Sequence, residues 1–269
     1  MSRPSPQLLS ILPAFLVADV RRTHAFYRDV LGFANGGVWG SEPELFGIAE
    51  LDGVQGFHFK SAGAGPPAPR PRPAVASDAD GPPLDAYVRM AAEHVQPLYV
   101  TLAKRGIPVL RAPRDQPWGQ RELLLADPDG HVLCFGGDLT GEWPAKLVTV
   151  CPEWTVSDPL ATGEFLRHAL GFPIVDTWGD PPAYAIARRE GATLHLRRAT
   201  APEQVRGNGA ADVWDAYVRC TGVDELAAEF QLRGVPLERG PEDKPYGMRE
   251  LEVLDPDGYA LCFGEEIGE

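Results

Sequence analysis

An internal repeat constrains this chain more than any other feature, because two copies of one sequence pattern imply two copies of one fold. The segment LPAFLVADVRRTHAFYRDVLGF from Leu12 returns as CPEWTVSDPLATGEFLRHALGF from Cys151, at an offset of 139 residues. Four further blocks recur in the same order, and the last pair is QPWGQRELLLADPDGHVLCFG and KPYGMRELEVLDPDGYALCFG. The 269 residues therefore predict two domains, residues 8–138 and residues 147–266, joined by a linker over residues 139–146.

Each copy has the pattern of two successive βαβββ motifs. A strand (AFLVAD or EWTVSD) leads into apolar residues at helical spacing, and the helix ends at Gly32 or Gly171. Short strands follow around Trp39 and Trp178 and at GFHFK and TLHLR. A second strand (DAYVR), a second helix and the strands RELLLAD and HVLCFG complete the first copy. The pattern predicts an α+β chain with four βαβββ motifs.

Three Pro- and Gly-containing segments are interpreted as connections. The stretch from Ala62 to Pro83 is rich in Pro and Gly, which predicts a mobile loop that interrupts the first copy. The sequence Asp-Pro-Asp-Gly occurs at residues 127–130 and again at residues 255–258. Pro suits the first central position of a tight turn and Gly supplies a positive φ, so we interpret both as hairpin turns and not as paired catalytic carboxylates.

Charge and cysteine content restrict the class of partner. The 25 basic and 38 acidic residues give a net charge of −13, which argues against nucleic-acid binding. Residues 1–139 carry 13 Lys and Arg against 15 Asp and Glu, so the remaining residues carry −11 of that charge and would favour a cationic partner. Four widely spaced cysteines predict free buried thiols. Without an apolar stretch of membrane-spanning length or a signal-peptide layout, we expect a cytoplasmic protein that does not bind membranes.

The repeated blocks resemble the vicinal-oxygen-chelate superfamily, whose members include glyoxalase I, extradiol dioxygenases and the bleomycin resistance proteins. The opening FYRDVLGF and the closing RELLLADPDGHVLCFG carry the resemblance, and PWGQRE followed by DPDGHVLCF is most similar to the bleomycin resistance branch. The resemblance implies two tandem domains with cupped mixed sheets and a ligand cleft inside each. Bleomycin resistance proteins pair two chains, so the fused chain would be a pseudo-dimer, acting as a monomer or as a homodimer.

The resemblance also provides a test for a metal, because the superfamily's enzymes bind a divalent ion through four side chains. These positions fall on Leu12 or Cys151, His58 or His195, Asp85 or Asp215 (to within a residue or two), and Cys134 or Cys262. Leucine offers no donor atom, and two thiolates would serve hard, oxygen-preferring ions poorly. We therefore expect no metal or other cofactor, with Cys151, His195, Asp215 and Cys262 as a weak candidate set. If the copies exchange halves, Cys151 and His195 would instead meet Asp85 and Cys134.

Strand alternation indicates which side chains would line a cleft. In DAYVR the Asp, Tyr and Arg lie on one face, although the Tyr could equally face the core while the Arg pairs with the Asp. Tryptophans and tyrosines suit stacking on planar or cationic ligands. We expect the ligand to be held by Trp39, His58, Asp85, Tyr87, Arg89, Trp118, Glu122, Trp154, Trp178, His195, Trp214, Asp215, Tyr217, Arg219, Tyr246 and Glu250.

Three functions fit these features. The first is a small-molecule binder of the bleomycin-resistance type, which sequesters an aromatic and cationic compound without altering it. The second is a metal-dependent lyase or isomerase similar to glyoxalase, or an enzyme similar to extradiol dioxygenases, with one degenerate site. The third is a dimerising or regulatory module. The sequence contains no GxSxG, HExxH, GxGxxG or P-loop motif, and no residue is predicted to be catalytic.

Overall fold

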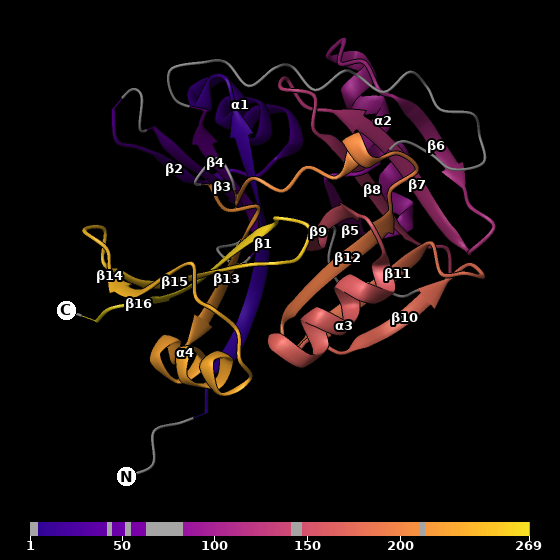
Figure 1. Cartoon of the computed structure of the whole chain (residues 1–269). Helices are drawn as coiled ribbons and strands as arrows, with labels where there is room; N and C mark the ends of the chain where they lie inside the picture. Colours follow the sequence, from indigo (N-terminus) through magenta and orange to yellow (C-terminus); the bar gives the residue numbers. More distant parts are fainter. Residues whose placement is uncertain are drawn as a thin grey trace. The chain divides into compact units, whose positions relative to one another are not determined.

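The computed structural model describes residues 5–41, 45–51, 55–62, 83–140, 147–209 and 213–268. The first copy contains two βαβββ motifs (Figure 1). Its elements are β1 (Gln7–Val17), α1 (Val20–Phe26) continued by a π-helical turn (Tyr27–Leu31), β2 (Asn35–Trp39), β3 (Phe46–Leu51), β4 (Gln55–Ser61), β5 (Ala86–Met90), α2 (Ala92–Lys104), β6 (Arg111–Asp115), β7 (Gln120–Ala126) and β8 (Val132–Asp138). The predicted mobile loop falls mainly on residues 63–82, which lie outside the described residues.

The second copy repeats this order. Its elements are β9 (Leu147–Val156), α3 (Pro159–Ala169), β10 (Ile174–Trp178), β11 (Tyr184–Arg189), β12 (Ala192–Arg198), a short 3₁₀ turn (Pro202–Gln204), β13 (Ala216–Thr221), α4 (Val223–Leu232), β14 (Arg239–Asp243), β15 (Met248–Leu254) and β16 (Ala260–Glu266). The α+β class and the four βαβββ motifs are confirmed. None of the helices in the described part of the chain is long and apolar enough to cross a membrane.

Local sequence explains where the first helix of each copy begins and ends. Asp19 and Asp158 are the N-caps, and each carboxylate accepts a hydrogen bond from a backbone N–H in the first turn of its helix. At the other end, Gly32 and Gly171 adopt φ of 88° and 75°, the left-handed conformation that ends a helix without side-chain strain. The predicted glycine exits are therefore confirmed.

Two eight-stranded mixed sheets organise the chain, and each contains four strands from each copy. The first sheet has the order β14-β15-β16-β13-β1-β4-β3-β2, and the second has the order β10-β11-β12-β9-β5-β8-β7-β6. Strand β1 pairs antiparallel with β13, whereas β13 pairs parallel with β16 and β5 pairs parallel with β8. The strand order answers a question that the sequence left open, because the two copies exchange halves.

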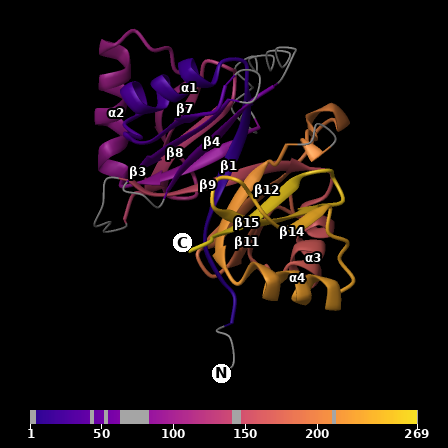
Figure 2. The ribbon, with the colours of Figure 1, turned by 90° about the vertical axis from the view of Figure 1, so that its left-hand side faces the viewer.

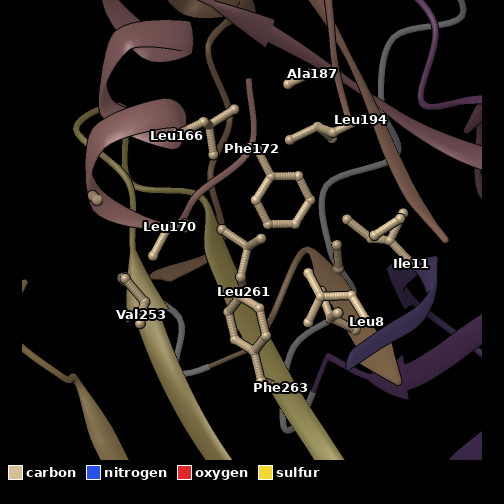
Figure 3. Close-up of a cluster of buried hydrophobic side chains, with 14 of the residues drawn as sticks. Leu8, Ile11, Leu166, Leu170, Phe172, Ala187, Leu194, Val253, Leu261 and Phe263 are labelled. Carbon is tan, nitrogen blue, oxygen red and sulfur yellow. The ribbon is translucent and has the colours of Figure 1, made fainter. Parts of the chain in front are cut away.

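The chain forms two compact units, and strands β1 and β9 each contribute to both. The copy-one unit comprises Phe15–Cys151, and the copy-two unit comprises Met1–Ala14 with Pro152–Glu269. In the copy-one unit, α1 and α2 lie on the same side of the strands (Figure 2). In the copy-two unit, Leu8 and Ile11 of β1 pack into the hydrophobic core beside Leu166, Phe172 and Phe263 (Figure 3). The N-terminal part of β1 is therefore an integral part of the copy-two core.

The two Asp-Pro-Asp-Gly segments form the predicted turns. Each turn belongs to the second βαβββ motif of its copy and also forms hydrogen bonds with the first motif. Gly130 and Gly258 adopt φ of 93° and 83°, and each donates its backbone N–H to the carbonyl of the first Asp of its turn. The second Asp of each turn reaches the start of the first helix. Asp129 accepts a hydrogen bond from the backbone N–H of Ala18 at 2.9 Å, and Asp257 accepts one from the hydroxyl of Thr162 at 3.1 Å.

Candidate functional site

A row of paired residues crosses β1, β13, β16 and β15 within the copy-two unit. Leu12 pairs with Tyr217, Tyr217 pairs with Cys262, and Cys262 pairs with Glu252. Directly paired residues project from the same face of a sheet, so these four side chains share one face. The register corrects the sequence alignment, because Tyr217, and not Asp215, lies beside the first and fourth metal positions. Asp215 instead accepts hydrogen bonds from the backbone N–H groups of Asn208 and Ala260, both at 2.9 Å.

The hydroxyl of Tyr217 crosses β16 and reaches a buried carboxylate on β15. It donates a hydrogen bond to Glu250 Oε1 at 2.9 Å, and the hydroxyl of Tyr246 donates to Glu250 Oε2 at 2.7 Å. Glu250 is only 1% exposed, whereas Tyr246 is 60% exposed. Glu250 is paired with Gly264, which leaves room above β16 for the Tyr217 ring. The predicted residues Tyr217, Tyr246 and Glu250 therefore form one cluster, which we call the Glu250 site.

Both hydroxyls of the Glu250 site are hydrogen-bond donors across the physiological pH range. Burial, together with the neighbouring Cys262 and Glu250, raises the pKa of Tyr217 far above its usual value. Burial and the hydrogen bond to Glu250 also raise the pKa of Tyr246. A phenol that stays protonated donates to the carboxylate and does not act as a base.

Gly264 makes the Glu250 site possible, and its replacement provides a direct test. A Cβ at this position would lie 1.8 Å from the Tyr217 hydroxyl oxygen, so the tyrosine ring would have to move. We expect Gly264→Ala to lower the free energy of unfolding by about 1–3 kcal/mol, which urea denaturation would measure. Gly268→Ala is the control, because a Cβ there has no neighbouring atom within 4 Å. Equal stability of the two variants would contradict this role of Gly264.

The copy-one unit contains a counterpart of this site whose carboxylate is neutralised. Tyr87 lies over Gly136, and its hydroxyl is 3.4 Å from Glu122 Oε1 and 3.1 Å from Gln120 Oε1. Trp118 Nε1 donates to Glu122 at 3.3 Å. The guanidinium of Arg111 forms an ion pair with Glu122 at 3.0 Å. The buried carboxylate therefore has a cationic partner in copy one.

In copy two, the arginine equivalent to Arg111 lies near a different carboxylate. Arg239 lies 4.0 Å from Glu252, the residue that replaces Leu124 of copy one. Within the described part of the chain, Glu250 is bonded by the two tyrosine hydroxyls and forms no ion pair with a Lys or Arg. Copy two thus has one more carboxylate on this face and no cation on Glu250. The excess negative charge expected from the sequence is in part located at this site.

The donor set at the metal positions of the first sheet does not fit the divalent metal that the superfamily's enzymes hold. In the first sheet, Leu12 offers no donor, Tyr217 is a neutral phenol, and burial followed by the nearby Glu250 and Glu252 raises the pKa of Cys262 well above its ordinary value. The weak candidate set is also divided, because Cys151 and His195 belong to the second sheet whereas Cys262 belongs to the first and Asp215 immediately precedes a strand of the first. The exchange of halves instead places Cys151 and His195 in the same sheet as Cys134, with Asp85 immediately before β5. Among the described residues, no three His, Cys, Asp or Glu side chains converge as metal ligands.

A second polar cluster in the copy-two unit was mostly missed by sequence reasoning. Glu153 on β9 accepts hydrogen bonds from Tyr184 at 2.7 Å and from Arg197 Nε at 2.8 Å, and the Tyr184 hydroxyl lies 2.7 Å from His195 Nδ1. Of the four, only His195 was predicted. A signal was present, because copy one has Ala14 and Phe46 at the positions of Glu153 and Tyr184.

The remaining predicted residues have varied surroundings. Asp85 accepts a hydrogen bond from the backbone N–H of Val132, and Arg89 forms an ion pair with Asp138 at 3.0 Å. Trp154 is buried in the core and stacks on Tyr259. Trp214 packs edge-on against Tyr217 and His58 edge-on against Phe46, while Arg219 lies half-buried on β13. Trp39, Trp118 and Trp178 are exposed.

Comparison with known proteins agrees with the fold. The sequence model of the Glyoxalase/Bleomycin resistance protein/Dioxygenase superfamily matches residues 11–135 and again residues 151–263. No curated protein matches the chain by sequence. Glyoxalase I from Zea mays is similar in structure, with a TM-score of 0.63 at 17% identity over 97% of this chain and 92% of that one. A Bacillus subtilis protein provisionally named a dioxygenase gives a TM-score of 0.66 at 13% identity over 98% and 86%.

These structural likenesses show a shared fold and leave the chemistry of the individual sites to be argued from their residues. The family model, by contrast, covers most of the sequence and matches both copies separately. The chain therefore belongs to the glyoxalase/bleomycin resistance protein/dioxygenase superfamily, also called the vicinal-oxygen-chelate superfamily, with two tandem family regions.

Proposed function

We propose that this protein binds and sequesters an aromatic, cationic small molecule without altering it, as bleomycin resistance proteins do. The observation that carries the proposal is Glu250, a carboxylate that is 99% buried, is bonded by two tyrosine hydroxyls and forms no ion pair with a Lys or Arg among the described residues. A buried charge is costly unless it is paired, and a ligand cation would supply the missing partner. Glu122 is already paired with Arg111, so it does not need a ligand cation as a partner.

Aromatic side chains around Glu250 support a planar ligand. Tyr246 is both the most exposed member of the site and a hydrogen-bond donor to Glu250, so its ring is accessible from solvent. Trp214 packs edge-on against Tyr217, with ring centroids 5.3 Å apart. Tyrosine and tryptophan rings attract cations through their faces and stack on flat ligands. The negative charge of the second copy would also attract a cation at longer range.

The chemistry of the site favours binding over turnover. Superfamily enzymes polarise their substrate with a divalent metal, whereas the corresponding positions in the sheet that contains Glu250 carry Leu12, His58, a protonated phenol and a thiol whose pKa is raised. Tyr217 and Tyr246 donate hydrogen bonds and hold the carboxylate in place. A fixed carboxylate and aromatic walls give affinity and orientation, which is all that sequestration requires.

Fluorescence titration with the planar cation proflavine tests this proposal. We expect saturable binding to the wild-type protein and a loss of about tenfold or more in affinity for Glu250→Gln, because the ligand cation loses its charged partner. Glu122→Gln is the matched control and should leave the affinity unchanged. Tyr246→Phe changes a mostly exposed residue, so it should fold even if Glu250→Gln does not. It should weaken binding by a smaller factor than Glu250→Gln.

The fate of the bound molecule distinguishes sequestration from catalysis. We expect mass spectrometry to recover proflavine unchanged after prolonged incubation with the protein. Absence of saturable binding, or equal effects of Glu250→Gln and Glu122→Gln, would refute the cation site. Conversion of a bound compound that depends on added divalent metal would favour the enzyme alternative.

A further inference from the structure

Both asparagines of the chain, Asn35 and Asn208, are followed by a glycine. An Asn-Gly pair can modify itself, because the backbone nitrogen of the glycine can attack the side-chain carbonyl carbon of the asparagine. Ammonia leaves, a five-membered succinimide forms, and solvent water opens the ring to give aspartate or isoaspartate. An amide and one water molecule thus become a carboxylic acid and ammonia. Glycine favours the attack because it has no Cβ to obstruct the approach.

The fold holds Asn208 and Gly209 against the second Asp-Pro-Asp-Gly turn and its surroundings. The backbone N–H of Asn208 donates to Asp215 at 2.9 Å, and the backbone N–H of Gly209 donates to the Gly258 carbonyl at 3.0 Å. A Cβ on Gly209 would lie 2.5 Å from Leu254 Cδ2, so this segment has little room to rearrange. The nitrogen that would attack Asn208 must therefore first give up a hydrogen bond and leave a tightly packed position.

The surroundings of Asn35 are more open. Asn35 is the first residue of β2, an outer strand of the first sheet (Figure 1), and both Asn35 and Gly36 are exposed. Gly36 adopts φ of 95°, a conformation that residues with a Cβ rarely adopt and that departs from a regular strand. A sheet edge opens locally at a lower free energy than the core strands. The two residues that must rearrange therefore lie where water and local opening are both available.

We propose that Asn35 is a modification site, where the folded protein converts its own asparagine to aspartate or isoaspartate while the fold protects Asn208. Glu50 of β3 is buried and lies directly opposite Asn35. The modification places a second acidic side chain beside Glu50, and like charges directly opposite each other destabilise a strand pair. Isoaspartate also adds one methylene group to the backbone of β2. The reaction thus loosens the strand that ends at Trp39.

Peptide mapping by mass spectrometry tests the proposal on the full chain after incubation at mildly alkaline pH. We expect the mass change of an amide-to-acid conversion at Asn35, and a rate about tenfold or more lower at Asn208, because Gly209 must first break its hydrogen bond. In urea that unfolds the protein, the two Asn-Gly pairs should react at similar rates. The inference is overturned if both sites react equally fast in the folded protein. It is also overturned if Asn35 stays unmodified in the folded protein over a period in which both sites react in urea.

Two substitutions of Asn35, an exposed residue, separate the reaction from its consequence. Asn35→Gln keeps an amide but lengthens the side chain, so the five-membered ring cannot form and the isoaspartate signal in an enzymatic methylation assay should be lost. Asn35→Asp imitates one product and should unfold at a lower urea concentration than Asn35→Gln, because it places the charge beside Glu50. Retention of the isoaspartate signal in Asn35→Gln, or equal urea midpoints for the two variants, would contradict the proposal. The result does not depend on ligand binding at the Glu250 site.

Discussion

Asp127→Asn should destabilise the protein by about 3 kcal/mol at neutral pH, because this carboxylate is the buried centre of a hydrogen-bond network. Its Oδ2 lies 2.9 Å from His131 Nδ1 and 3.2 Å from the Tyr27 hydroxyl. Its Oδ1 accepts backbone N–H groups from Asp129 and His131, both at 2.9 Å. The amide would keep the backbone contacts but would lose the charge that His131 and Tyr27 surround.

The pH dependence of this effect has a definite sign. Burial acts to raise the pKa of Asp127, but the charge and hydrogen bonds of His131 outweigh it and hold the pKa below its usual value. A lowered pKa in the folded state contributes stability above the unfolded value, near 3.8, and that stability is lost as the pH falls through the folded value. Urea denaturation at neutral and acidic pH should therefore show a smaller loss for Asp127→Asn in acid.

Asp255→Asn should have the opposite effect and stabilise the protein by up to about 4 kcal/mol above pH ~7. Asp255 is the copy-two equivalent of Asp127, but Leu166 and Tyr259 stand where copy one has Tyr27 and His131. The Tyr259 hydroxyl donates to the Thr155 carbonyl at 2.8 Å. Asp255 Oδ2 is left buried without a hydrogen-bond partner among the described residues. Replacing this carboxylate with a neutral amide removes an uncompensated charge.

Burial raises the pKa of Asp255 to about 7, and the nearby Asp257 adds to the shift against the opposing backbone N–H groups. The folded protein therefore binds this proton more tightly than the unfolded chain, whose pKa is near 3.8. The stability of the wild-type protein should fall as the pH rises between these two values, and the advantage of Asp255→Asn should grow over the same range. Urea denaturation across this range provides the measurement. Shifts in the same direction for Asp127→Asn and Asp255→Asn would contradict this interpretation of both aspartates.

The two aspartates show that the copies share a backbone structure but differ in the partners of equivalent side chains. In each, the first Asp of the turn still accepts backbone N–H groups, and the second still binds the start of the first helix. Each turn also retains a stacked pair of rings, Phe15 on His131 and Trp154 on Tyr259. Hydrogen bonds to the backbone and ring packing are common to both copies, whereas the partners of the side-chain charge differ.

The same divergence affects the candidate sites. Both copies place a tyrosine hydroxyl near a buried glutamate across a glycine, but among the described residues an arginine pairs with that glutamate in copy one and not in copy two. Both copies place an aromatic ring beside a histidine, and in copy two this ring is Tyr184, whose hydroxyl also donates to the buried Glu153. One chain therefore contains an internal control for each site, which is why paired variants can separate function from folding.

The sequence alone determined the elements and their order. Capping by Asp19 and Asp158, glycine exits at Gly32 and Gly171, and the two Asp-Pro-Asp-Gly turns depend on interactions between residues close together in the chain. Such interactions leave a local pattern, so the α+β class, the four motifs and the family were predicted correctly. The residues of the Glu250 site were also named in advance, because Tyr217, Tyr246 and Glu250 belong to repeated blocks.

Only the tertiary structure decided which strands pair and which side chains meet. Leu12 pairs with Tyr217 although more than two hundred residues separate them in the sequence. This register shows that Tyr217, and not Asp215, occupies the third metal position. Glu153 joins Tyr184 and His195 through three separate strands. Pairing between distant strands depends on the packing of the whole core, because a strand's own alternation specifies its faces but not its neighbours.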